Sequence, residues 1–183
     1  MKLVILDRDG VINEDSDAFI KTPQEWLPIE GSLEAIRDLH VNGFKVVIAT
    51  NQSGLARKLF DEYELAKIHQ KMCIMVEDAG GLIDGIFFCP HGPDDNCQCR
   101  KPKTGLLEAI AEEFDTSLEG VPFIGDSLRD IEAAKAANCI PFLVQTGKGN
   151  KTLVSMDDQQ LQFVSVVPNL QHAVAQILNN SAL

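Results

Sequence analysis

The chain is short of positive charge. It has 16 lysines and arginines against 27 aspartates and glutamates, so its formal net charge is −11. Nucleic acids and anionic membranes bind basic surfaces, and we therefore expect neither as a partner. An anionic small molecule would have to be held by local positive side chains, by backbone amides or by a bound metal ion.

Long hydrophobic runs are also lacking at the start of the chain. Only the four apolar residues 3–6 precede Asp7, which is too few for a secretory leader or a membrane span. We therefore expect a cytoplasmic location. A length of 183 residues, with 45% hydrophobic and 23% charged positions, predicts a single globular domain over residues 1–183. The acidic, unpatterned surface favours a monomer.

Cysteine is scarce, and most of it lies in one loop. Five cysteines are an odd number, and in a reducing compartment disulfides are not expected. The loop reads C-x-H-x5-C-x-C and offers the ligands of a tetrahedral zinc site: Cys89, His91, Cys97 and Cys99. A redox or disulfide pair is the alternative, but Cys97 and Cys99 are too close in sequence for an unstrained bond. Four protein ligands predict a structural zinc that holds the loop 89–103, including its basic run.

Apolar strands alternate with amphipathic helices along the chain. Residues 3–6 form a continuous apolar run, which is typical of a strand buried on both faces of a parallel sheet. The same reasoning predicts further strands at 45–50, 83–88, 122–125, 141–144 and 163–167, and helices at 32–42, 61–79, 105–114, 128–137 and 169–179. This alternation predicts an α/β fold with a parallel sheet.

Polar residues follow four of the predicted strands, at the point where each strand ends. Asp7 and Asp9 come after the first strand, and residues 50–54 come after the second. The cysteine loop follows the third, and Asp126 follows the fourth. Ligands of such sheets bind outside the carboxyl ends of the strands, so we expect these residues to meet at one edge.

Asp7 and Asp9 have a spacing that suits phosphate chemistry. Carboxylates two residues apart at a strand end point to roughly the same side. One can attack phosphorus to give an aspartyl-phosphate, while the other protonates the leaving oxygen and later activates water. Because close carboxylates repel, a cation is expected between them, and Mg²⁺ suits such a site. Asp126 is placed as a second carboxylate on that ion, whereas Asp130 is expected to cap its helix.

Other residues near the strand ends offer binding groups. Residues 50–54, Thr-Asn-Gln-Ser-Gly, can form an anion cradle, although an ordinary polar loop explains them equally well. Lys101 and Arg100 can neutralise charge on a transferring phosphoryl group. An irregular insertion at about 13–28 either closes over a substrate or only caps the core. Three histidines are expected to be ordinary helix residues: His40, His69 and His172.

Together, these motifs resemble the haloacid dehalogenase superfamily of phosphatases. The matching segments are Leu6-Asp7-Arg8-Asp9-Gly10-Val11-Ile12-Asn13, Thr50 to Gly54, Arg100-Lys101-Pro102 and Gly125-Asp126. The zinc loop narrows the resemblance to the heptose bisphosphate phosphatase family within it. The resemblance covers about residues 3–147. It implies a Rossmann-like three-layer sandwich without a large cap domain, in which loops cover the site.

The resemblance also implies a role for each matching residue. Asp7 is the implied nucleophile and a Mg²⁺ ligand, Asp9 the general acid/base and a Mg²⁺ ligand through its carbonyl, and Asp126 the remaining ligand. Thr50 and Lys101 are implied to stabilise the phosphoryl group. The implied substrate-binding residues are Asp15, Ser16, Asp17, Ala18, Asn51, Gln52, Ser53 and Arg100.

The implied reaction is removal of the 7-phosphate of D-glycero-D-manno-heptose 1,7-bisphosphate, within nucleotide-heptose and lipopolysaccharide core synthesis. Two features depart from the family pattern. Ser127 stands where Lys is frequent, which removes one positive charge near the substrate. Only five residues separate His91 from Cys97, fewer than in some members.

Three other functions fit parts of the same pattern. A histidinol-phosphate phosphatase resembles this chain in the same motifs and zinc loop. A nucleic-acid 3′-phosphatase is similar around the aspartate and threonine motifs, but a net charge of −11 argues against it. A zinc-stapled binding protein without turnover is disfavoured because every catalytic position is filled.

Overall fold

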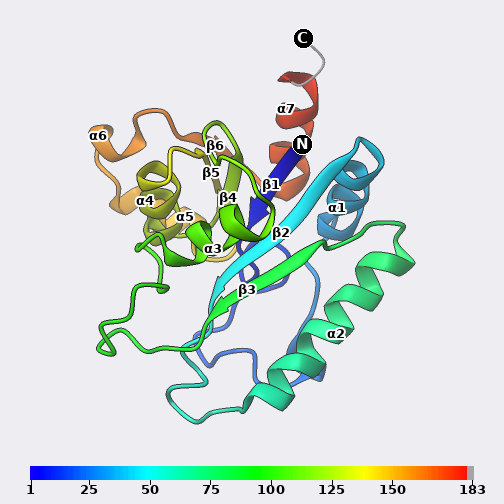
Figure 1. Cartoon of the computed structure of the whole chain (residues 1–183), viewed down its shortest axis with the longest axis vertical. Helices are drawn as coiled ribbons and strands as arrows, with labels where there is room; N and C mark the ends of the chain where they lie inside the picture. Colours follow the sequence, from blue (N-terminus) through cyan, green and yellow to red (C-terminus); the bar gives the residue numbers. More distant parts are fainter. Residues whose placement is uncertain (181–183) are drawn as a thin grey trace.

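The computed structural model describes residues 1–180 as a parallel sheet covered by helices (Figure 1). The strands are β1 (Lys2–Leu6), β2 (Phe44–Asn51), β3 (Gly85–Cys89), β4 (Pro122–Gly125), β5 (Ile140–Val144) and β6 (Ser165–Val167). The helices are η1 (Pro23–Glu25), α1 (Ser32–Val41), α2 (Glu62–Asp78), α3 (Gly105–Glu113), α4 (Leu128–Ala136), α5 (Gly149–Ser155), α6 (Asp158–Leu161) and α7 (Leu170–Asn180). The strand order is β3-β2-β1-β4-β5-β6 with parallel pairing throughout, which confirms the predicted α/β class.

Helices cover both faces of the sheet, as the apolar strands require. Successive side chains of a strand point to opposite faces. Val4 and Leu6 of β1 pack in a cluster with α1, α2 and α7, whereas Leu3 and Ile5 pack with α3 and α4. The result is the three-layer, Rossmann-like sandwich that the resemblance implied.

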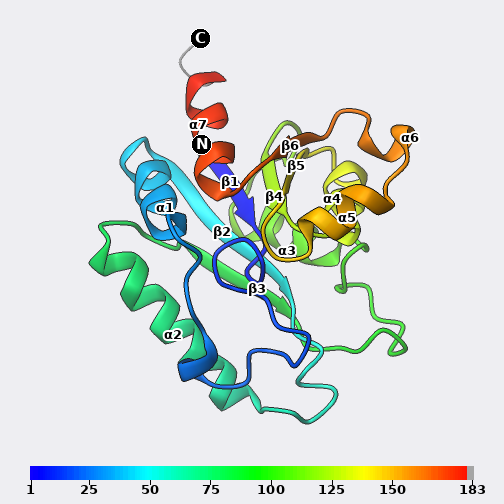
Figure 2. The same ribbon diagram turned by 180° about the vertical axis from the view of Figure 1, so that it is seen from behind.

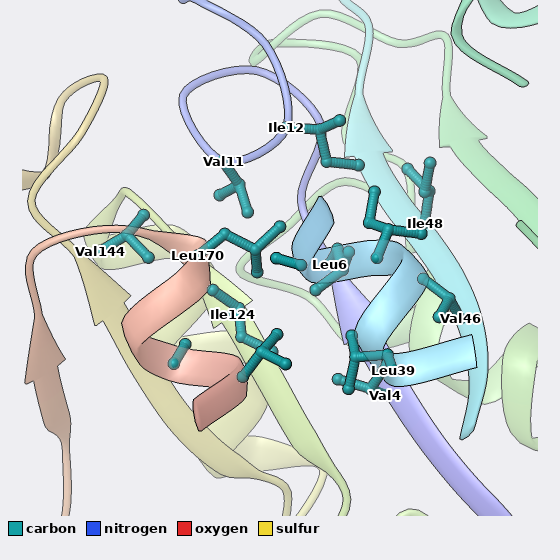
Figure 3. Close-up of a cluster of buried hydrophobic side chains, with 14 of the residues drawn as sticks. Val4, Leu6, Val11, Ile12, Leu39, Val46, Ile48, Ile124, Val144 and Leu170 are labelled. Atoms are coloured by element: carbon teal, nitrogen blue, oxygen red, sulfur yellow. The ribbon is translucent and has the colours of Figure 1, made fainter. Parts of the chain in front are cut away.

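The cluster that contains Val4 and Leu6 is the larger of the two, and it includes side chains from strands on both sides of β1. Figure 3 shows Leu39 of α1 near Val4, and Leu170 of α7 near Leu6 and Ile124. All five side chains are at most 1% exposed. Burying one such side chain contributes about 1.5–3 kcal/mol. This packing fixes the strand ends of β1 and β4 relative to each other.

β1 lies at the point where the direction of winding changes. It pairs with β2 on one side and with β4 on the other, so that Ile5 lies between Val47 and Phe123. After β3 the chain returns past β1 to build β4, β5 and β6 (Figure 1). Ligands of doubly wound sheets bind at such a switch point, outside the carboxyl ends of the strands.

The segment between β1 and α1 loops away from β1 and returns past α2 (Figure 2). Trp26 is fully buried in the larger core cluster. Lys71 of α2 donates to the carbonyls of Pro23 and Trp26 at 2.7 and 2.8 Å. One part of this segment therefore packs on the core, and an earlier part lines the cavity described below.

The C-terminal third departs most from the sequence prediction. The apolar pattern predicts a strand from Phe163, but β6 begins at Ser165 because Phe163 has φ 63°, in the left-handed region. Helices α5 and α6 were missed because they are short and polar. α5 is fixed by its surroundings: Thr152 Oγ1 donates to the Asp126 carbonyl at 2.9 Å. Within residues 1–180, no helix is both long and apolar enough to cross a bilayer.

Candidate active site

The site lies at the carboxyl edge of the sheet, over the switch point between β1 and β4. A cavity of about 270 Å³ opens there, lined by the loops that follow five strands. The sequence indicated four of these strand ends, and the loop after β5 adds Lys148. The predicted residues that line the cavity are Asp7, Asp9, Asp15, Ser16, Asp17, Thr50, Asn51, Gln52, Ser53, Arg100, Lys101 and Asp126. Ala18 is exposed and is not one of the lining residues.

Asp7 is the first residue after β1. Its amide donates to the carbonyl of Ile124 at 2.9 Å, which continues the pairing of β1 with β4. Its Oδ1 accepts from the amide of Arg8 at 2.8 Å and lies 3.1 Å from Lys101 Nζ. The side chain is 13% exposed. A carboxylate that is fixed in place yet accessible from a cavity is suited to nucleophilic attack.

Lys101 carries a positive charge from the zinc loop into this site. Its Nζ lies 3.1 Å from Asp7 and 2.6 Å from Asp130, and it donates to the Ala49 carbonyl at 2.7 Å. Burial lowers the pKa of this amine, but the charges of Asp130 and Asp7 outweigh burial and raise it. The buried lysine therefore stays charged.

Asp130 does more than the sequence indicated. The prediction that it caps α4 is confirmed, since its Oδ2 accepts from the amide and hydroxyl of Ser127 at 3.1 and 2.6 Å. Its other oxygen holds Lys101. The capping of α4 can be read from the local sequence. The contact with Lys101 cannot, because it requires β3 and β4 to end at the same edge of the sheet.

Asp126 fits into a gap between two glycines. A Cβ placed on Gly10 would lie 2.0 Å from Asp126 Oδ2, and one on Gly147 would lie 2.3 Å from it. Both glycines have positive φ, at 81° and 55°. The Lys148 amide donates to the same oxygen at 2.8 Å. The backbone thus holds Asp126 facing Asp7 across the switch point.

Three carboxylates gather in a way that fits a divalent cation. Oxygens of Asp7, Asp126 and Asp130 lie within 4.8 Å of one another. Burial raises the pKa of Asp7 to about 7. The neighbouring carboxylates raise it further, while the charge of Lys101 opposes this shift. Burial and the charges of Asp7 and Asp130 raise the pKa of Asp126 to about 8. A cation relieves this repulsion, so the donor set fits Mg²⁺.

We expect magnesium binding to strengthen as pH rises from 6 to 8. The folded, metal-free protein holds more protons on Asp7 and Asp126 than the unfolded chain between pH about 4 and 8, because folding raises both pKa values. Its free energy of unfolding therefore falls as pH rises through this window. Mg²⁺ must displace those protons, so its dissociation constant should fall about tenfold or more over this range.

Isothermal titration calorimetry in two buffers of different ionisation enthalpy measures both the affinity and the protons released. The protein is first freed of magnesium on a cation-exchange resin, with its zinc content checked. An affinity that does not change with pH, with no proton release, would contradict this account of the cluster.

Asp9 lies apart from this carboxylate cluster. Its Oδ1 accepts from Asn13 Nδ2 at 2.8 Å, and its Oδ2 accepts from Gln52 Nε2 at 3.1 Å. Arg8 grips both oxygens through Nε and Nη2 at 2.9–3.1 Å. Burial raises the pKa of Asp9, but the charge of Arg8 and the hydrogen bonds from Asn13, Gln52 and Arg8 outweigh burial and lower it.

The loop after β2 is mostly used to hold other parts of the site. Asn51 accepts from the Lys101 amide at 3.0 Å and donates to the Lys101 carbonyl at 3.1 Å. Gln52 donates to Thr50 Oγ1 at 2.9 Å as well as to Asp9. Within residues 1–180 the Thr50 hydroxyl donates to no acceptor, so its hydrogen can point toward an anion in the cavity that Thr50 lines. Residues 50–54 are thus a shaped part of the site rather than a loose polar loop.

The four predicted zinc ligands come together in the loop after β3. Cys89 Sγ lies 3.7 Å from His91 Nδ1, 3.7 Å from Cys97 Sγ and 3.1 Å from Cys99 Sγ. A tetrahedral zinc ion, with bonds of about 2.0–2.3 Å, separates its ligand atoms by about 3.5–3.8 Å. The first two distances lie within this range, and the Cys89–Cys99 distance is shorter. Burial opposes ionisation of Cys97, but hydrogen bonds from the Arg100 amide and neighbouring thiols lower its pKa to about 7. The donor set fits zinc, and Lys101 stands two residues after its last ligand, Cys99.

We expect Cys97→Ser to lose the zinc and to destabilise the protein. A structural zinc site contributes several kcal/mol of folding energy. In a chain of this size each kcal/mol corresponds to about 2–4 °C, so Tm should fall by roughly 5–15 °C. Differential scanning calorimetry with elemental analysis for zinc tests this. Cys73→Ser, at a half-buried cysteine of α2, is the matched control and should keep one zinc per chain. A Cys97→Ser protein that retains its zinc would contradict the ligand assignment.

Sequence reasoning missed three positive side chains of the cavity: Arg57, Arg129 and Lys148. Lys148 Nζ lies 3.0 Å from Asp15 and 3.7 Å from Asp17. Ser127 stands where Lys is frequent in the family. Arg129, two residues later, lines the cavity and provides a positive charge in the same region. Each of these residues lies in a loop that follows a predicted strand, and this position could have marked it as a residue of the site.

Comparison with known families and proteins agrees with this geometry. The profile of the family described as HAD-hydrolase-like matches residues 98–173. A D-glycero-beta-D-manno-heptose-1,7-bisphosphate 7-phosphatase of Bordetella bronchiseptica is 59% identical over 153 residues, covering 84% of this chain and 86% of that protein. The protein of the same name from Pseudomonas putida is 55% identical over 153 residues, covering 84% of this chain and 87% of its own length.

Solved structures give the same result for the fold. The crystal structure of D,D-heptose 1,7-bisphosphate phosphatase from B. bronchiseptica, complexed with magnesium and phosphate, superposes with a TM-score of 0.93 at 52% identity. It covers 98% of this chain and 99% of that one. The phosphatase of that name from Burkholderia thailandensis superposes with a TM-score of 0.75 at 39% identity, covering 97% of this chain and 99% of its own.

Proposed function

The chain belongs to the heptose 1,7-bisphosphate 7-phosphatases of the HAD hydrolase superfamily, and on that premise we propose how its site works and on what substrate. The reaction is removal of the 7-phosphate of D-glycero-D-manno-heptose 1,7-bisphosphate, leaving heptose 1-phosphate. One observation carries the proposal. A single cavity holds Asp7 beside Lys101 at its base, and Arg57, Arg100 and Arg129 on its lining.

In the first step Asp7 acts as the nucleophile. One of its carboxylate oxygens forms a bond to phosphorus as the bond from phosphorus to the sugar oxygen breaks. The sugar oxygen keeps the bonding electron pair and takes a proton from Asp9, which must first be protonated against the charge of Arg8 and the hydrogen bonds that lower its pKa. The products are heptose 1-phosphate and an aspartyl-phosphate on Asp7.

In the second step water attacks the aspartyl-phosphate. Asp9, now a carboxylate, takes a proton from the water, and inorganic phosphate leaves with Asp7 regenerated. Lys101 and the Thr50 hydroxyl face the transferred group, where they balance its negative charge. The support is the position of Lys101 beside Asp7 and the orientation of Thr50 by Gln52.

The proposed metal ions have separate tasks. Asp7 and Asp126 hold Mg²⁺ together with the Asp9 carbonyl, and Asp130 supports them by holding Lys101. When bound, Mg²⁺ supplies positive charge against the carboxylates and phosphate oxygens. Cys89, His91, Cys97 and Cys99 would hold a zinc ion with four protein ligands, so its role would be structural rather than catalytic.

The second phosphate of the substrate meets the outer part of the cavity. Arg57 and Arg129 are exposed and Arg100 is half-buried, so their guanidinium groups are available to a ligand. Arg100 is oriented by donating to the His91 carbonyl at 3.2 Å. Guanidinium groups bind phosphate in bidentate fashion. This arrangement favours a bisphosphate over histidinol phosphate, which has one phosphate and a cationic amine.

We further propose the setting of the reaction. The enzyme works as a monomeric, cytoplasmic phosphatase on a small sugar bisphosphate, without nucleic acid or membrane partners, in nucleotide-heptose and lipopolysaccharide core synthesis. Residues 1–183 act as one domain in which loop 89–103 and the insertion at about 13–28 cover the site. The net charge of −11 supports the absence of polyanionic partners.

Phosphate release in Mg²⁺ tests the substrate directly. The panel contains both anomers of heptose 1,7-bisphosphate, heptose 7-phosphate and histidinol phosphate. We expect the β anomer of the bisphosphate to lead, as the names of the relatives indicate, with kcat/KM about 100-fold above histidinol phosphate. A preference for histidinol phosphate would overturn the substrate and keep the chemistry. No turnover of any compound would favour a binding protein.

A further inference from the structure

His69 of α2 was expected to be an ordinary helix residue, yet its ring reaches the active-site network. Its Nε2 lies 3.2 Å from Nη1 of Arg8, and the side chain of Arg8 is fully buried. On the other side, the ring of His69 packs against Phe88 of β3, with centroids 6.1 Å apart. The ring is therefore held between a strand and the guanidinium group of Arg8.

The direction of this hydrogen bond follows from chemistry. A guanidinium group has N–H donors and no acceptor. Nε2 of His69 must therefore be the acceptor, which places the ring proton on Nδ1 of a neutral imidazole. Burial and the nearby charge of Arg8 favour this neutral form, since they lower the pKa of His69 to about 3.

Arg8 carries the effect of His69 to Asp9. Of the five hydrogen bonds that described residues make to the Asp9 carboxylate, three come from Arg8 Nε and Nη2. The remaining two come from Asn13 and Gln52. Nη1, the nitrogen that does not touch Asp9, is the one that donates to His69. Fixing both edges of a planar guanidinium fixes its orientation.

We propose that His69 is a positioning residue, which accepts a hydrogen bond from Arg8 and thereby fixes the guanidinium that orients the Asp9 carboxylate. The inference rests on the proposed role of Asp9 as general acid/base. A general acid must be aimed at the leaving oxygen, and a displacement of about 1 Å can cost about 100-fold in rate. His69 touches neither substrate nor metal and acts only through Arg8.

Two substitutions separate positioning from a general structural role. His69→Leu removes the acceptor, while His69→Gln keeps one on a side chain of similar reach. Each is assayed on heptose 1,7-bisphosphate, whose sugar oxygen is a poor leaving group, and on p-nitrophenyl phosphate, whose phenolate leaves without a proton. Circular dichroism and zinc content confirm the fold of each variant.

We expect His69→Leu to lower kcat on the sugar bisphosphate about 10–100-fold with KM within about twofold. On p-nitrophenyl phosphate the loss should be about threefold or less, because protonation of the leaving group matters little there. His69→Gln should restore most of the rate on the sugar. Unchanged kcat in His69→Leu, or an equal loss on both substrates without rescue by glutamine, would overturn the proposal.

Asp9→Asn separates a failure of this proposal from a failure of the mechanism. If Asp9→Asn keeps its rate on the sugar, the role of Asp9 is wrong and the inference falls with it. If Asp9→Asn loses that rate while His69→Leu keeps it, only the role of His69 is wrong.

A measurement on the unmodified protein covers the case in which His69→Leu does not fold. Nitrogen-15 spectra of the histidine rings report which nitrogen carries the proton, with His69→Gln used for assignment. The proposal requires His69 protonated on Nδ1 and accepting at Nε2. A ring protonated on Nε2 would overturn it, because a guanidinium cannot accept that proton.

Discussion

Asp7→Asn should reduce phosphate release by about 10⁴-fold or more, the scale seen when a nucleophile is removed from an enzyme. An amide oxygen at this position cannot form the aspartyl-phosphate, although it keeps the shape of the side chain. Asp7 is fixed by the Arg8 amide and stands 3.1 Å from Lys101. Asp130 also contacts Lys101, but its side chain is only 1% exposed, against 13% for Asp7, so it is less accessible to a substrate. The assay is steady-state phosphate release on heptose 1,7-bisphosphate, with zinc content and Tm measured in parallel.

The stability of this variant distinguishes lost chemistry from lost structure. Replacing a buried carboxylate removes repulsion against Asp126 and Asp130, so metal-free Asp7→Asn should be at least as stable as the parent at pH 8. Asp7→Ala is the companion variant, since it cannot revert by deamidation. Activity retained in Asp7→Ala, with normal folding, would contradict the proposed nucleophile.

Lys101→Met should impair both catalysis and stability. In catalysis the variant loses the charge beside the transferred phosphoryl group, and kcat/KM should fall about 10³-fold. In the fold it leaves Asp7 and Asp130 without a cation that lies 3.1 and 2.6 Å away. Breaking a buried pair by removing one partner costs about 3–5 kcal/mol. Urea unfolding and phosphate release measure the two effects.

Lys103→Met is the matched control in the same loop. Lys103 is exposed, and among residues 1–180 its Nζ hydrogen-bonds to two groups of the same loop, the Cys97 carbonyl and Asn96 Oδ1. Its substitution should change kcat/KM by no more than about threefold, since exposed charges contribute little. Equal losses in Lys101→Met and Lys103→Met would show that the loop matters only as a whole, which would contradict the specific role of Lys101.

Much of the fold follows from local sequence patterns. Continuous apolar runs predict β1 and β4, because a strand that is buried on both faces of the sheet has apolar side chains at every position. Helices α1 and α4 end within one residue of their predicted limits, since their apolar faces repeat at the helical period. Phe163 could not be placed in this way, because its φ of 63° is set by the turn around it.

The proposed zinc ligands come together for a related reason. The two ligand pairs, Cys89 with His91 and Cys97 with Cys99, lie at most ten positions apart and need no distant element to meet. The aspartate pair after β1 is similarly local. Chemistry held within one loop can be read from spacing alone, and the roles of Asp7 and Asp9 were proposed on that basis.

What the sequence determined by itself is therefore the local part: most strands and helices, the clustering of two cysteine and histidine pairs in one loop, and the strand ends that carry polar residues. Only the tertiary structure decided that Lys101 would lie buried between Asp7 and Asp130, and that His69 would reach Arg8 from α2. These contacts join residues up to 94 positions apart in the sequence, the separation of Asp7 and Lys101. The order of strands and the rotation of each helix about its axis set such distances, and both come from packing of the whole core rather than from any local pattern.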